Sequence, residues 1–213
     1  MTPITIETIL AHSKARGEPS WLANRRVDAW RIFEATPPPT RSDEEWRRTG
    51  LGWMDRSDIN PSAPQLLNDS TAGLLPPHLS QASVVLVEHG VETTVVQVKP
   101  DAEAAGITAE SLSTAAGNSN QLVESHLATS LITPDAGKFQ ALNSALWTGG
   151  AFVHIPAGVQ LEAPIVILTT SHGPPVYPRT LIIAAPGSSA HLVECWLPEG
   201  SQSPSFANGS TEI

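Results

Sequence analysis

The chain has a single cysteine, Cys195, among its 213 residues. One cysteine excludes an internal disulfide, and it excludes a zinc or iron–sulfur site built from several cysteines of one chain. The sequence also has no GxxxxGK[ST] or GxGxxG phosphate loop, and no serine stands in a GxSxG turn. The common signatures of nucleotide-binding proteins and serine hydrolases are therefore missing.

Long apolar runs are missing as well. Runs such as 165–168 are far shorter than the roughly 18–20 residues that span a bilayer. The N-terminus has no basic region followed by a hydrophobic block, so we expect no signal peptide and a cytoplasmic location.

Basic residues are scarce outside the N-terminal quarter. Residues 1–56 carry nine of the 12 Lys and Arg residues and eight of the 21 acidic residues, so residues 57–213 hold three basic against 13 acidic residues. Such an acidic body repels phosphate backbones, which argues against nucleic-acid binding.

Aromatic residues are few apart from six tryptophans, so the core is expected to be mainly aliphatic, and 19 prolines and 15 glycines predict many turns and few long helices. Trp21, Trp30 and Trp46 lie near several arginines. They are interpreted as core residues, with a docking surface as the alternative.

Three zones follow one another. In the first, 1–56, we expect a helix that Gly17 ends, a second helix that starts at Pro19 and that the prolines 37–39 end, and a capping box formed by Ser42 and Glu45. The second helix has one apolar stripe, formed by Leu22, Ala29, Trp30 and Phe33.

The second zone, 57–148, is predicted to be mixed α/β. After a proline-rich connector, two β-branched runs flank Glu88-His89-Gly90 and predict a hairpin. Thr108 is a plausible helix cap, and two further helices are expected within 120–147.

The third zone, 149–213, loses the helical periodicity. Two segments share a plan in which a small-residue turn around Gly158 or Gly187 separates two strands, and the two glycines are 29 residues apart. This plan favours a β-solenoid, and two hairpins of an antiparallel sheet are the alternative. A strand starting near Ile213 lacks a cap, so we expect an N-terminal fragment of a longer protein.

Cys195 and His191 are the candidate site residues. On a strand, His191 and Cys195 lie on one face and Glu194 on the other, about 13 Å separating the first two at roughly 3.3 Å per residue. The two cannot chelate one metal ion alone, and a cysteine beside a valine is more often a buried small hydrophobe. We therefore predict no metal site and no catalytic residue.

Three stretches, 18–51, 138–167 and 179–213, resemble the SufD subunit of the SUF iron–sulfur cluster assembly system, within the SufB/SufD family. They carry "EPSWLANRRVDAWRIFEATPPPTRSDEEWRRTGL", "KFQALNSALWTGGAFVHIPAGVQLEAPIVI" and, in the last, "RTLIIAAPGSSAHLVE" with "SFANGSTEI". SufB resembles the chain too, but its Val-Glu-Gly-Cys pattern is Val193-Glu194-Cys195-Trp196 here. That one-residue offset argues against giving Cys195 the sulfur role of the SufB cysteine.

The resemblance implies an α+β N-terminal region followed by the first coils of a right-handed parallel β-helix. It implies a non-catalytic scaffold that pairs with a SufB-like paralogue and a SufC-like ATPase, the family's C-terminal helical domain and histidine being absent. The cluster would be assembled by the full complex, with no cofactor bound by this stretch alone.

A β-helix enzyme acting on carbohydrate or acyl groups is the rival. It would need clustered carboxylates, and the acidic residues of 149–213 have no adjacent pair.

Overall fold

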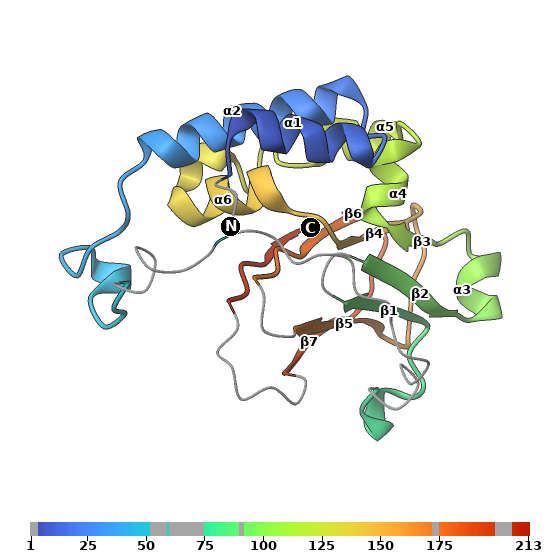
Figure 1. The fold of residues 1–213 in the computed structure, drawn as a ribbon. Helices are drawn as coiled ribbons and strands as arrows, with labels where there is room; N and C mark the ends of the chain where they lie inside the picture. The colour runs from blue at the N-terminus through green and yellow to red at the C-terminus, as the bar shows by residue number, and fades with distance from the viewer. Residues whose placement is uncertain (1–3, 52–58, 60–74, 90–91, 172–174, 199–205) are drawn as a thin grey trace.

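The computed structural model describes residues 4–51, 59, 75–89, 92–171, 175–198 and 206–213 (Figure 1). The helices are α1 Ile6–Ala15, α2 Ser20–Ala35, α3 Pro100–Ala104, α4 Leu112–Gly117, α5 Gln121–His126 and α6 Lys138–Leu146, and the 3-10 helices are η1 Glu44–Trp46, η3 Pro77–Leu79 and η4 Pro134–Ala136. The strands are β1 Val84–His89, β2 Glu92–Val98, β3 Thr108–Ser111, β4 Gly150–Ile155, β5 Ile165–Ser171, β6 Arg179–Ala184, β7 Leu192–Pro198 and β8 Ser210–Glu212. The architecture is α+β, and the predicted continuation into a parallel β-helix stays a prediction.

The two N-terminal helices form as their local sequence dictates. Thr5 and Thr8 close a capping box at the start of α1. Gly17 takes a φ of +65°, which a glycine adopts without steric cost, and so ends the first helix as predicted. Pro19 is the N-cap of α2, and α2 packs along α6 (Figure 1).

The strands form two four-stranded sheets, and both are mixed. Sheet A has the order β2-β1-β5-β7, and sheet B has the order β3-β4-β6-β8. In each sheet the first pair is antiparallel and the others are parallel. The β1–β2 pair is the predicted hairpin.

From β4 onward the chain alternates between the two sheets, so that each strand pairs in parallel with the strand after next. Gly150 is in register with Arg179, and Gln160 with Ser189, both 29 residues apart. Gly158 and Gly187 have φ values of +74° and +75°, and a Cβ on Gly187 would lie 3.8 Å from the Gly158 backbone. The two predicted glycine turns are therefore stacked.

Three apolar clusters hold the layers together. The largest lies between the helices and the outer face of sheet B, where Phe152 and Leu181 contact it. The second fills the space between the sheets and includes Leu86, Val153 and Ile167. The third lies on the outer face of sheet A. The largest cluster contains residues of all three zones. The division at 56 and 148 therefore describes a change of sequence pattern, and the three domains stay a prediction.

Two local predictions were wrong. Thr108 lies in β3 rather than capping a helix, because the segment pairs with β4, and Ser111 precedes α4 instead. The capping box expected from Ser42 is replaced by η1, before which the Asp43 carboxylate accepts hydrogen bonds from the Thr40 backbone and hydroxyl. Tertiary pairing and a competing side-chain hydrogen bond decided these segments. Most of the proline-rich connector lies outside the described residues.

Candidate functional site

Cys195 lies on β7, an edge strand of sheet A, where it is paired with Leu168. Its side chain is half-buried and packs with Val193 and Leu197 against the outer cluster of sheet A. Leu192 packs against the cluster between the sheets, so the predicted alternation along this strand is present. The surroundings of Cys195 are those of a small hydrophobic residue.

His191 is exposed and precedes β7, and its backbone carbonyl accepts a hydrogen bond from Ile165. Within the described ranges, no group of three or more His, Cys, Asp or Glu side chains could hold a metal ion. The structure thus gives neither His191 nor Cys195 a ligand partner set among those residues. A role for either in the complete protein stays untested.

The carboxyl groups of Glu88 and Glu194, which are far apart in the sequence, both face the space between the sheets. Glu88 is the second-last residue of β1, near the hairpin turn, yet it is only 2% exposed because it follows Val84 and Leu86 on the inward face. Glu194 lies on the same inward face of β7 but at the open edge, where it is exposed. Only the pairing of β1, β5 and β7 brings them into one sheet, and no sequence spacing signals that.

Hydroxyl groups surround both carboxyl groups. Thr169 donates a 3.0 Å hydrogen bond to Glu88 Oε2. Thr180 donates to Glu194 Oε1 at 3.1 Å, and Thr211 donates to both oxygens of Glu194 at 2.9 and 3.0 Å. We call these five residues the inter-sheet seam.

Burial raises the pKa of Glu88 to about 7. The hydrogen bonds from Thr169 and from the backbone of Ala151 act in the opposite direction, and the charge of Glu194 adds to the rise. Glu88 Oε1 is buried and has no hydrogen-bond partner among the described residues. Within the described chain, Glu88 is the acidic residue whose pKa departs most from its ordinary value. It is buried, one of its oxygens lacks a hydrogen-bond partner there, and it lies in the seam.

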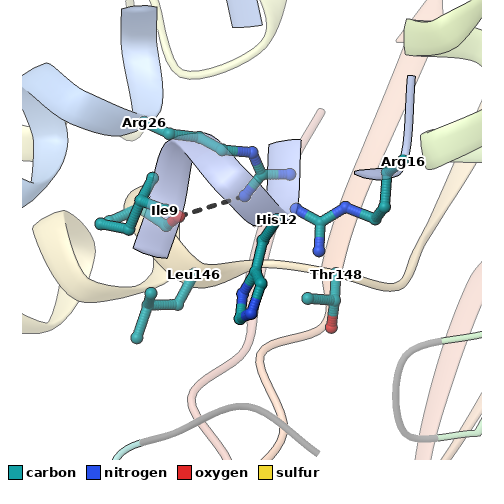
Figure 2. A pocket seen from close by; sticks show the side chains of 7 residues that line it. Ile9, His12, Arg16, Arg26, Leu146 and Thr148 are labelled. Atoms are coloured by element: carbon teal, nitrogen blue, oxygen red, sulfur yellow. Dashed lines mark hydrogen bonds between the residues drawn. The ribbon is translucent and has the colours of Figure 1, made fainter. Parts of the chain in front are cut away.

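A basic pocket lies under α1, where the side chains of His12, Arg16, Arg26 and Thr148 converge (Figure 2). The guanidinium group of Arg26 is engaged in structural contacts. It pairs with Glu18 at 2.8 Å and donates to the carbonyls of Ala145 and Trp147. Arg16 also pairs with Glu18. These contacts join α1, α2 and the end of α6, so the pocket has a structural explanation.

A second buried network joins the helices to sheet B. Arg179 and Glu212 are each completely enclosed and pair at 2.5 Å. Arg179 also donates to Asn143 and Ser144 of α6, and Glu212 accepts from the backbone of Ala128. Because every charged atom has a partner, this pair holds α6 against β6 and β8 rather than serving chemistry.

Of the tryptophans interpreted as core residues, Trp30 is one, whereas Trp21 and Trp46 are half-buried. Trp30 is 4% exposed and belongs to the largest cluster, and Trp21 packs against that cluster. Trp46 stacks on Phe139 at 4.9 Å. The exposed tryptophan of the described chain is Trp196, 48% exposed, on the seam side of β7.

Comparison with protein families completes this picture. Residues 11–167, from α1 into β5, match the SufBD protein N-terminal region. The chain belongs to the SufBD family. The match does not separate SufD from SufB, so the resemblance to the wider family is confirmed and the finer assignment to SufD remains a prediction.

Individual relatives support this assignment. The chain is 30% identical over 207 residues to an iron–sulfur cluster assembly SufBD family protein of Mycobacterium tuberculosis, covering 88% of this chain and 24% of the relative. It is 28% identical over 209 residues to the iron–sulfur cluster assembly protein SufB of Bacillus subtilis, covering 90% of this chain and 43% of that protein. A SufBD family protein of Staphylococcus epidermidis is 29% identical over 208 residues. The chain thus spans less than half the length of these relatives. No helix among the described residues is long and apolar enough to cross a membrane.

Proposed function

We propose that this SufBD-family chain works in iron–sulfur cluster assembly, as the N-terminal part of a non-catalytic scaffold subunit of SufD type. The observation that carries the proposal is the family match from α1 into β5, together with relatives named as iron–sulfur cluster assembly proteins. The cluster is the cargo of the full complex, and this stretch alone holds none.

The placement of Cys195 supports the SufD type over the SufB type. The thiol packs with Val193 and Leu197 against the outer cluster of sheet A, as a hydrophobic residue does. A sulfur-carrying cysteine would need an exposed and electropositive setting. The acidic character of residues 57–213 works against that setting.

The strand pattern supports a scaffold built as a right-handed parallel β-helix, of which β4 to β8 would be the first coils. Successive strands alternate between two sheets and pair in parallel at steps of about one coil. Stacked coils give a rigid framework, because each strand is hydrogen-bonded to the next coil. A SufB-like paralogue and a SufC-like ATPase are the proposed partners, in the cytoplasm.

Co-expression of the full-length protein with a SufB-like and a SufC-like protein tests this proposal. We expect the three to elute together in size-exclusion chromatography, at a mass in light scattering that accounts for all three chains. Elution of this protein apart from a stable SufB–SufC complex would contradict the proposal. A matched sample without the ATPase shows whether the paralogue contact forms independently.

A further inference from the structure

The inter-sheet seam combines two acidic side chains with three hydroxyl groups, and no basic side chain is bonded to either carboxyl group in the described chain. The buried end is Glu88, and the open end is Glu194 at the edge of sheet A. Residues 57–213 also carry a large excess of negative charge. Such an environment attracts cations.

The two carboxyl groups reach neighbouring points of the same row on sheet B. Ala151, Thr180 and Thr211 are paired across β4, β6 and β8, and their side chains share the inward face. The backbone of Ala151 interacts with Glu88, whereas the hydroxyls of Thr180 and Thr211 hold Glu194. The charge of Glu194 also acts on the Glu88 carboxyl group, so the two groups are near each other. A Ca²⁺ ion lies about 2.4 Å from each ligand oxygen, so a cation that bridges them needs an oxygen of each within about 4.8 Å of the other.

Glu88 Oε1 is the oxygen at which a cation could be held. The side chain is nearly fully enclosed, and among the described residues this oxygen has no hydrogen-bond partner, whereas Oε2 accepts from Thr169. An ionised carboxyl leaves a buried lone pair unsatisfied, and a protonated one can leave a buried O–H without an acceptor. A cation at Oε1 relieves the first of these costs and removes the need for the proton.

We propose that the inter-sheet seam binds one divalent cation of the Ca²⁺ class between Glu88 Oε1 and the Glu194 carboxylate, with threonine hydroxyls and water completing the shell. All the side-chain donors are oxygens, which hard cations prefer. Cys195 faces the opposite side of β7, so sulfur-seeking metals find no thiolate in the seam. The site would join sheets A and B at their open edge.

Calorimetric titration of the metal-free full chain with CaCl₂ at pH 8 tests the proposal. We expect one Ca²⁺ per chain, and an affinity that falls roughly 10- to 100-fold in both Glu88→Gln and Glu194→Gln, because each removes a charged ligand. Glu162→Gln is the matched control, since Glu162 is exposed and outside the seam. Thermal unfolding of each variant checks that it is folded. Absence of binding in the wild type, or equal binding in all four proteins, would overturn the proposal and leave only a buried water to satisfy Oε1.

Two measurements on otherwise intact protein keep the proposal testable if Glu88→Gln fails to fold. Protons compete with the cation for Glu88, so we expect Ca²⁺ affinity to fall about tenfold from pH 8 to pH 6. Tb³⁺ in the seam should luminesce through excitation of Trp196, which is in register with Thr169. Trp196→Phe should reduce the luminescence without weakening binding. A pH-independent affinity, or an unchanged Tb³⁺ signal in that variant, would contradict the assigned place.

Discussion

Glu88 has an environment that its position in the sequence does not indicate. A glutamate beside a hairpin turn is ordinarily solvated, but parallel pairing with β5 encloses this one. Its pKa of about 7 in the folded chain is above the ordinary glutamate value of 4.5. The folded state therefore binds the proton more tightly than the unfolded chain does.

The raised pKa of Glu88 predicts that its contribution to stability is fully present below about pH 4.5 and is lost as the pH rises through about 7. Glu88→Gln removes this dependence, so at pH 8 the variant should gain on the order of 3 kcal/mol relative to its difference from wild type at pH 4.5. Urea unfolding of both proteins across this pH range, in metal-free buffer, measures the effect. Parallel stability curves for the two proteins would show that Glu88 is not perturbed.

Cys195 is predicted to be dispensable for cluster assembly, because its thiol packs as a half-buried hydrophobe on the outer face of sheet A. Cys195→Ser in the full-length protein should support cluster formation at the wild-type rate, with a stability loss of about 1 kcal/mol from placing a hydroxyl among apolar neighbours. An anaerobic cluster-formation assay measures the rate. Loss of activity with an intact complex would give the thiol a chemical role.

Arg179 and Glu212 are predicted to depend on each other. Glu212→Gln leaves Arg179 buried without its counter-charge, so we expect a loss of about 3–5 kcal/mol in the free energy of unfolding. The double variant Arg179→Met and Glu212→Leu removes both charges and should lose much less than the sum of the losses of the single variants Arg179→Met and Glu212→Leu. A double-mutant cycle by urea unfolding measures this coupling. Additive losses would show that the pair is not coupled.

At the scale of elements, the close approach of β4 to β6 requires a glycine at position 150. A Cβ at Gly150 would overlap the carbonyl oxygen of Arg179 and press on Leu112. Gly150→Ala should therefore cost about 2 kcal/mol or more, since backbone atoms cannot move aside as a flexible side chain does. Gly117→Ala is the control, because that helical position has open space and alanine favours the helix. Equal thermal stability of the two variants would contradict this explanation.

Elements with strong local signals were predictable from the sequence. The helix ended by Gly17, the helix after Pro19 and the hairpin around Glu88 all formed where capping, glycine and β-branched residues indicated them. Gly158 and Gly187 also marked stacked turns, because a repeated backbone conformation leaves a repeated residue type. The cap predicted at Thr108 was wrong because helix caps and short strands favour similar residues. Its strand partner, His154, lies 46 positions away in the sequence, so no local pattern indicates the pairing.

The seam could not be predicted in the same way. Glu88 and Glu194 come from different zones, and Thr169, Thr180 and Thr211 come from three different strands. The acidic residues of 149–213 contain no adjacent pair, and Glu88, the partner of Glu194, lies outside that range in the hairpin. The strand order of sheet A, which inserts β5 between β1 and β7, is what assembles it.

At the scale of the whole molecule, one arrangement explains both the packing and the proposed role. Arg26 joins α2 to the end of α6, Arg179 and the largest apolar cluster fix the helical layer to sheet B, and the second cluster fixes sheet B to sheet A. β7 and β8 end the two sheets at the same edge. Among the described residues the helices and the two sheets therefore pack as one body, which is compatible with the proposed scaffold role.

Cluster formation by the reconstituted complex tests the scaffold claim most directly. The assay would follow cluster absorbance under anaerobic conditions, with ferrous iron, a cysteine desulfurase, a SufB-like protein and a SufC-like ATPase, with and without the full-length form of this protein. A scaffold subunit predicts that omitting it lowers the cluster yield severalfold and that restoring it recovers the yield. Equal yields with and without it would contradict the account.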